Sequence, residues 1–134
     1  MAMFLPSLIA PWIISRIGIY GLIALGLVAM FTALIVSSQY FSVDGFWLSL
    51  VLLGIGWNFM FVGGTSLLAL VYRDGEQFTV QALNDGLVFS ISAFASFSSG
   101  WILAAWQWPG VLLASFPLLL LPSALFVWTR LNPK

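Results

Sequence analysis

The sequence predicts an all-α protein, a polytopic bundle of transmembrane helices, and three observations lead to this fold class. Of the 134 residues, 62% are hydrophobic and only 6% are charged, whereas a soluble domain carries about 25% charged residues. The apolar residues form runs that are long enough to cross the roughly 30 Å hydrocarbon core of a bilayer. Short polar stretches separate these runs. We therefore expect one membrane domain, residues 1–134, with four full spans and one partial N-terminal helix.

The first two elements differ in length. As a helix, residues 1–15 would reach only about 22 Å, at about 1.5 Å per residue. They therefore predict a partial helix, which is either a re-entrant or interfacial segment or the end of a longer helix. After a turn marked by Arg16 and Gly18, residues 17–40 predict a complete span. Its surface is almost entirely aliphatic, which is typical of an outer helix that faces lipid.

The remaining three elements are also long enough to span. Residues 46–72 and 78–105 predict two helices that are joined by the most charged loop, residues 73–77. Three tryptophans gather near the end of the second helix, as in the aromatic belt of a membrane interface: Trp101, Trp106 and Trp108. Residues 109–129 predict the last span, in which internal prolines should produce kinks that a membrane helix tolerates.

The basic residues predict an orientation. With these spans, Arg16, Arg73, Arg130 and Lys134 fall on one side of the membrane, and the opposite loops contain Asp44 but no Lys or Arg. Cytoplasmic loops of membrane proteins carry an excess of Lys and Arg. We therefore expect Arg16, the loop 73–77 and the C-terminus to be cytoplasmic.

The composition argues against several function classes. The chain has no His and no Cys, so it lacks histidine bases, thiol nucleophiles and the usual zinc ligands. A serine nucleophile needs a base, and a pair of acids within the membrane is also missing, because only Asp85 lies inside a predicted span. The net charge is zero without a basic block, which argues against nucleic acid. We expect no enzyme, no metal, no cofactor and no nucleic-acid partner.

Polar residues on the predicted span 46–72 are candidates for a solute path. Four residues recur at i, i+4, i+7 and i+11 and so share one helical face: Gly54, Asn58, Phe61 and Thr65. An asparagine near the middle of a membrane is costly unless it meets a polar partner. One interpretation is hydrogen bonding and packing between helices. The other is that four residues line a polar cavity: Trp57, Asn58, Phe61 and Thr65.

Small residues predict close contacts between helices. Gly63 and Gly64 stand next to each other in the third element, where packing is favoured over a local loosening of the helix. In the fourth element Ser92, Ser96 and Gly100 are spaced four residues apart. Such a ladder lets two helix backbones approach closely, so we expect another helix to pack on it.

Asp85 is the acid within a predicted span, about two turns into the fourth helix. A carboxylate at such a position is a functional candidate by default. With its neighbour Asn84 it is interpreted as a tie or gate lock at the cytoplasmic end, where Arg16 or Arg73 could pair with it. Direct handling of a proton or solute and a simple helix cap are the alternatives.

Two stretches of the chain resemble helices of a known transporter family. GIGWNFMFVGGTSLLALVYR, followed by VQALNDGLVFSISAFASFSSG, closely resembles the tenth and eleventh helices of bacterial major facilitator superfamily transporters. Upstream, FLPSLIAPWIISRIGIYG is similar to the end of the eighth helix and the turn into the ninth. The loop signature of that turn is roughly G-x-x-x-D-R-x-G-R-R. Arg16 and Gly18 match this signature, whereas Pro11, Ser15, Ile19 and Tyr20 depart from it.

The resemblance covers the whole chain, from the end of the eighth helix through the twelfth. It implies a secondary active transporter of the bacterial inner membrane that moves a small solute by alternating access. It also implies a partnership with the lipid bilayer and with missing N-terminal helices of the same transporter, because such proteins enclose their site between two halves. The alternatives are a self-contained small membrane protein that acts by oligomerisation, as an exporter or complex subunit, and a non-functional truncated remnant.

Overall fold

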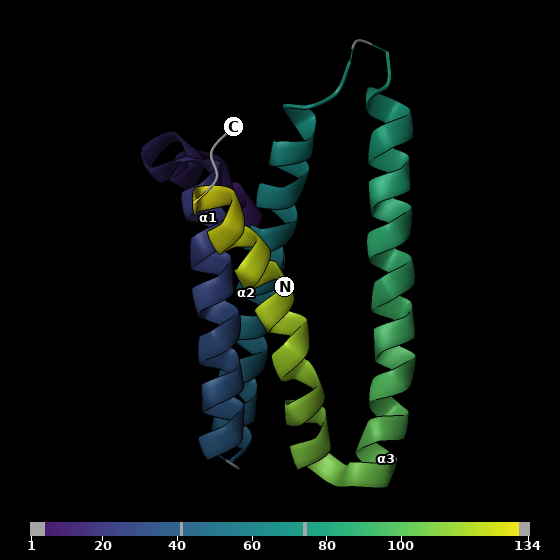
Figure 1. The fold of residues 1–134 in the computed structure, drawn as a ribbon. Coiled ribbons are helices and arrows are strands. Elements are labelled where there is room, and N and C mark those ends of the chain that lie inside the picture. The colour runs from purple at the N-terminus through teal and green to yellow at the C-terminus, as the bar shows by residue number, and fades with distance from the viewer. Residues whose placement is uncertain (1–4, 41, 74, 132–134) are drawn as a thin grey trace.

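The structure, a computed structural model, describes residues 5–40, 42–73 and 75–131, and all regular elements in this part are α-helices. Helix α1 spans Leu5–Gln39, α2 spans Val43–Ala69 and α3 spans Gln77–Leu131 (Figure 1). Each of the three is long and apolar enough to cross a membrane. The chain is therefore all-helical, with three long apolar helices in its described part.

Single residues interrupt α1 and α3. Gly18 (φ 77°, ψ 172°) divides α1 into a first arm, 5–17, and a second arm, 19–39. Gln107 (φ 55°, ψ −162°) divides α3 into a first arm, 77–106, and a second arm, 108–131. In Figure 1 α3 runs the length of the molecule and then folds back. The expected four full spans and separate partial helix are instead three helices in the described part of the chain, two of which are interrupted by a single residue that changes the helix direction without a loop.

Helices α1 and α2 form the packed part of the molecule. Their backbones approach most closely where Gly26 and Gly56 face each other. A Cβ built on Gly56 would lie 2.8 Å from the carbonyl oxygen of Gly26, and one on Gly26 would lie 3.0 Å from the carbonyl oxygen of Gly56. Two glycines therefore bring the helices into backbone contact, as small residues do in membranes.

The first arm of α1 completes this core. Ala10, from that arm, and Leu22, from the second arm, are fully buried, and they cluster with Phe59 of α2, which is 7% exposed. Ile13, Ile14, Ile55 and Val62 pack around them at the edge of the cluster. The break at Gly18 thus turns the first arm of α1 onto the surface that α1 and α2 share.

The second arm of α3 lies along α1 and is held at both ends. Near its C-terminal end, the Arg130 guanidinium carbon lies 4.8 Å from the centroid of the Tyr20 ring, and Phe126 lies 6.4 Å from the same ring. Near its N-terminal end, Trp108 Nε1 donates a hydrogen bond to the Ser37 carbonyl oxygen, 3.2 Å away. The arm is therefore antiparallel to the second arm of α1.

The first arm of α3 stands apart from the rest of the chain (Figure 1). Gly110 is the buried residue recorded for α3, and it belongs to the second arm. Large apolar side chains of the first arm are strongly exposed, with Phe97 at 85% and Phe94 at 74%. Within a bilayer such a surface faces lipid or a further helix.

The basic residues gather near one end of the bundle. The Gly18 break, the connection between α2 and α3, and the C-terminal end of α3 lie at one end in Figure 1, opposite the α1–α2 connection and the Gln107 break. Arg16 lies next to the Gly18 break, Arg73 lies in the connection between α2 and α3, and Arg130 lies near the C-terminal end of α3. Lys134, and residue 74 of the charged loop, lie outside the described residues.

Candidate solute-binding cavity

A cavity of about 770 Å³ lies between the second arm of α1, α2 and the second arm of α3. Each helix contributes a stripe of residues spaced three and four apart, such as Met30, Leu34 and Ser37 of α1, which is one helical face. The first arm of α3 contributes Val88 alone among the described lining residues. A pocket of this size, with mainly apolar walls and a few polar groups, is typical of small-molecule sites.

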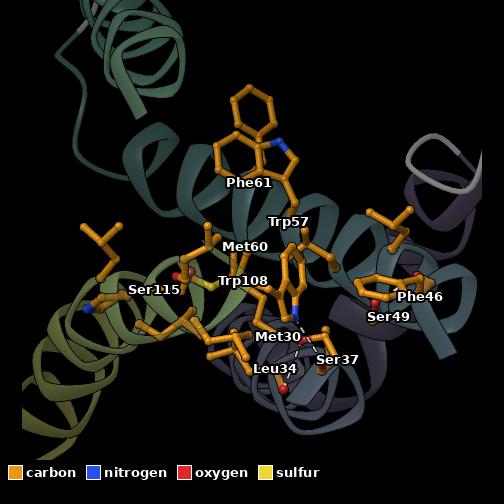
Figure 2. A pocket seen from close by; sticks show the side chains of 18 of the residues that line it. Met30, Leu34, Ser37, Phe46, Ser49, Trp57, Met60, Phe61, Trp108 and Ser115 are labelled. Atoms are coloured by element: carbon orange, nitrogen blue, oxygen red, sulfur yellow. Dashed lines mark hydrogen bonds between the residues drawn. The ribbon is translucent and has the colours of Figure 1, made fainter. Parts of the chain in front are cut away.

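Aromatic side chains form a large part of the wall. Phe46, Trp57 and Phe61 come from α2, and Trp108 comes from the second arm of α3 (Figure 2). Trp108 is fixed by its hydrogen bond to Ser37 and by an edge-to-face contact with Phe46, whose ring centroid is 5.1 Å away at 69°. Trp57 and Phe61 project from α2 in the same direction, because they are four positions apart on the helix. The Trp57 indole N–H donates no hydrogen bond within the described chain.

Three serine hydroxyls supply the other polar groups of the wall. Ser37 donates to the Leu34 carbonyl oxygen at 3.1 Å, Ser49 to that of Phe46 at 2.8 Å, and Ser115 to that of Val111 at 2.8 Å. Because each hydroxyl hydrogen is donated to a carbonyl oxygen of the same helix, the hydroxyl oxygens remain available as acceptors. None of the described residues that line the cavity is ionisable at neutral pH.

The four residues expected on a solute path separate into two groups. Trp57 and Phe61 line the cavity. Asn58 is buried and lies one turn from both Ile55 and Val62, which pack on the α1–α2 core. The Thr65 hydroxyl donates within α2, to the carbonyl oxygens of Phe61 at 2.9 Å and Val62 at 3.1 Å. The shared face predicted from spacing therefore has an aromatic part in the cavity and a polar part outside its wall.

Asp85 belongs to a hydrogen-bonded chain that connects Tyr72, in the segment between α2 and α3, to the first arm of α3. Its Oδ1 accepts hydrogen bonds from Gln81 Nε2 at 3.1 Å and from Asn84 Nδ2 at 3.2 Å. The Tyr72 hydroxyl donates to Gln81 Oε1 at 2.7 Å. In the described part of the chain the hydrogen bonds of Asp85 thus lead through Gln81 to Tyr72, and a tie or gate lock at Asp85 stays a prediction.

The two arginines proposed as partners of Asp85 are placed differently. The Arg16 guanidinium carbon lies 5.6 Å from the centroid of the Trp12 ring, a cation–π contact within the first arm of α1. Arg73 is exposed in the connection between α2 and α3. A pairing of Asp85 with either arginine stays a prediction.

The residues proposed for helix packing also differ in their surroundings. A Cβ on Gly63 would lie 2.5 Å from Ile23 Cγ1, so Gly63 packs on α1. At Gly64 and Gly100, apart from the adjacent residues and the backbone of the same helix, no atom of the described chain lies within 4 Å of such a Cβ. Ser96 is exposed, and Ser92 donates to the Val88 carbonyl oxygen of its own helix at 2.7 Å. The ladder on the first arm of α3 therefore stays a prediction.

Sequence reasoning did not find the residues that complete the cavity. Phe46, Ser37 and Ser115 were not identified as site residues, and Trp108 was interpreted as part of an interfacial belt. The signal was present in the spacing of residues 30–37, 46–61 and 108–122, where the lining side chains recur three and four apart. Each stripe looks like an ordinary apolar helix face until the three helices are placed together.

Comparisons with known proteins identify one curated relative. No protein-family model and no solved structure matches the chain. The whole chain is 37% identical, over an alignment of 137 positions, to the riboflavin transporter RfnT of Brucella anthropi. The chain spans about a third of the length of that relative, with 33% of it covered.

The similarity to a transporter and the apolar helices both indicate a membrane protein. The described part of the chain has three helices that are long and apolar enough to cross a bilayer, and the chain resembles part of a transporter along its whole length, so it is an integral membrane protein. The relative is a transporter and not an enzyme, which supports the expectation that this chain is not an enzyme either. Membership of the major facilitator superfamily stays a prediction.

Proposed function

We propose that this chain forms part of a secondary active membrane transporter that carries riboflavin or a closely related flavin. The similarity of the entire chain to the riboflavin transporter, at 37% identity, is the observation that supports this proposal most directly. The cavity adds to it, because aromatic side chains and hydroxyl oxygens suit a ligand that combines a flat ring with hydrogen-bonding groups.

We further propose the topology of a major facilitator superfamily C-terminal half. At 1.5 Å per residue, the second arm of α1, α2 and the two arms of α3 would measure about 30–45 Å, enough for four spans. The first arm of α1 would measure only about 20 Å and would form the partial element. The open apolar surface of the first arm of α3 supports packing against further helices of the same transporter, which would enclose the path and permit alternating access.

Uptake by a cell that cannot make riboflavin tests the proposed function. The gene region that encodes the chain, with any in-frame sequence upstream of Met1, is expressed in a bacterial riboflavin auxotroph that lacks flavin uptake. We expect growth on low external riboflavin and accumulation of radiolabelled riboflavin, with an empty vector as control. A well-expressed protein in the membrane that leaves accumulation at the vector level would contradict the proposed substrate.

The proposed orientation places the α2–α3 connection in the cytoplasm of a cell with an inner membrane. Because the chain has no native cysteine, single cysteines can be introduced as Ser42→Cys and Glu76→Cys, at opposite ends of the bundle. A membrane-impermeant maleimide should label Ser42→Cys in intact cells and Glu76→Cys only after permeabilisation. The reverse pattern would show the opposite topology.

A further inference from the structure

We propose that the corner where α1 bends at Gly18 and α3 ends is a binding site for an acidic phospholipid, whose phosphate is held by Arg16 and Arg130. This inference goes beyond the proposed function, because it concerns the membrane around the chain and not the solute that is carried. The bound lipid would join the bend of α1 to the C-terminal end of α3.

The fold brings the two arginines to this corner from distant parts of the sequence. Arg16 lies two positions before Gly18, where α1 changes direction, and Tyr20 lies two positions after it. Arg130, at the C-terminal end of α3, rests on the Tyr20 ring, with its guanidinium carbon 4.8 Å from the ring centroid. In Figure 1 the end of α3 lies by the bend of α1. Two positive charges therefore flank the same short stretch of α1.

An aromatic ring positions each guanidinium without neutralising it. The Arg16 guanidinium carbon lies 5.6 Å from the centroid of the Trp12 ring, as Arg130 lies over Tyr20. All four side chains are exposed. A guanidinium that stacks on a ring keeps N–H donors at its edge, and these can bind two oxygens of one phosphate. The arginines are thus held in place with their donors available to an anion.

The described chain offers these arginines no acidic partner. Neither guanidinium forms an ion pair with a described residue, and the contact that each makes is with an aromatic ring. Asp44 belongs to the opposite end of the bundle, and Glu76 and Asp85 lie near the start of α3, whose first arm stands apart from α1 (Figure 1). Two like charges that are held close together repel each other, and an anion between them removes this repulsion. Charge complementarity therefore favours an anionic occupant.

Apolar side chains beside the arginines indicate that the anion is a lipid. Leu8, Trp12 and Arg16 are spaced four positions apart, so they share one face of the first arm of α1. Leu8 and Trp12 are strongly exposed. Acyl chains can lie on these two side chains while the phosphate meets Arg16, whereas a free phosphate would gain nothing from the apolar part of the face. Basic sites at the ends of transmembrane helices bind acidic headgroups in this way.

Lipid binding to the purified chain in detergent micelles tests the assignment. Native mass spectrometry measures the binding of dioleoyl phosphatidylglycerol and of dioleoyl phosphatidylcholine, which have the same acyl chains and different headgroups. We expect the wild type to bind the acidic lipid about tenfold more tightly. Equal affinity for the two lipids would overturn the proposal without recourse to any variant. An excess of inorganic phosphate should not displace the acidic lipid, and full displacement would show that the site takes free phosphate instead.

Variants with matched charge distinguish a defined site from general attraction to positive charge. Arg16→Gln and Arg130→Gln should each weaken the binding of phosphatidylglycerol about fivefold. Arg73→Gln is the control, because Arg73 carries the same charge at the same end and is exposed without an aromatic contact in the described chain. It should leave the affinity unchanged.

A conservative variant tests whether geometry contributes as well as charge. Arg16→Lys keeps the positive charge but lacks the planar fork that binds two oxygens, so its affinity should fall between those of the wild type and Arg16→Gln. Circular dichroism checks that each variant keeps its helices. Equal losses in Arg16→Gln, Arg130→Gln and Arg73→Gln would overturn the assignment of the site to this corner.

Discussion

The contact between Gly26 and Gly56 gives a sharp prediction about helix packing. In Gly56→Ala the new Cβ would lie 2.7 Å from Met30 Cγ and 2.8 Å from the Gly26 carbonyl oxygen. Ordinary contacts between such atoms begin at about 3.5 Å, so the two helices would have to separate locally by roughly 0.7 Å. The Met30 side chain can rotate away, but the carbonyl oxygen belongs to a helix backbone and cannot.

The size of the effect follows from a matched comparison with Gly64→Ala. Both glycines lie inside α2, so both variants gain the higher helix propensity of alanine, about 1 kcal/mol. Apart from the adjacent residues and the backbone of the same helix, nothing in the described chain lies within 4 Å of a Cβ at Gly64, whereas at Gly56 the extra atom overpacks the interface at a cost of about 1–3 kcal/mol. Gly56→Ala should therefore be less stable than Gly64→Ala by about 1–3 kcal/mol.

Reversible unfolding of the purified protein in mixed micelles measures this difference. Denaturing detergent is titrated, and the loss of helix is followed by circular dichroism for the wild type and both variants. Gly64→Ala is expected to be at least as stable as the wild type, and Gly56→Ala is expected to be less stable than Gly64→Ala. Equal unfolding midpoints for the two variants would refute the backbone contact between α1 and α2.

Two further hydrogen-bonded contacts lead to measurable changes, with the same unfolding assay as the readout. Trp108→Phe keeps an aromatic ring beside Phe46 but removes the donor to the Ser37 carbonyl oxygen, so it should lower the free energy of unfolding by about 1 kcal/mol. Trp106→Phe, at an exposed neighbouring position, is the control. Equal stability of the two variants would argue against the hydrogen bond. Tyr72→Phe and Gln81→Leu should show a coupling energy of about 0.5–1 kcal/mol in a double-mutant cycle, and strictly additive effects would show that the two side chains do not interact.

The sequence predicted the kind of fold well because the strongest signals in it are local. Apolar length and the scarcity of charge are properties of each run by itself, and they identify membrane helices without any knowledge of neighbours. The predicted turn at Gly18 coincides with the break in α1, since glycine is a residue that accepts a positive φ. These features need no tertiary information.

The site was less predictable because its residues come from three helices. Spacing placed Asn58 and Phe61 on one face, but it could not tell which neighbour that face would meet. Asn58 lies by the α1–α2 core and Phe61 lies in the cavity. Likewise, Trp108 looked like an interfacial residue, and only the fold brings it to Ser37 across 71 positions of sequence. The positions of polar residues along one helix do not predict which other helices pack against each of its faces.

Gly18 and Gln107 have similar backbone angles, but different causes maintain them. Glycine occupies this region without steric cost, whereas a residue with a side chain pays about 1–3 kcal/mol. At position 107 we expect the contacts that the adjacent Trp108 makes with α1 and α2 to offset this cost. We therefore expect an order of assembly, in which the pairing of α1 and α2 comes first. The end of α3 then doubles back and docks, so the bundle is completed from its N-terminal helices toward the C-terminal end of the chain.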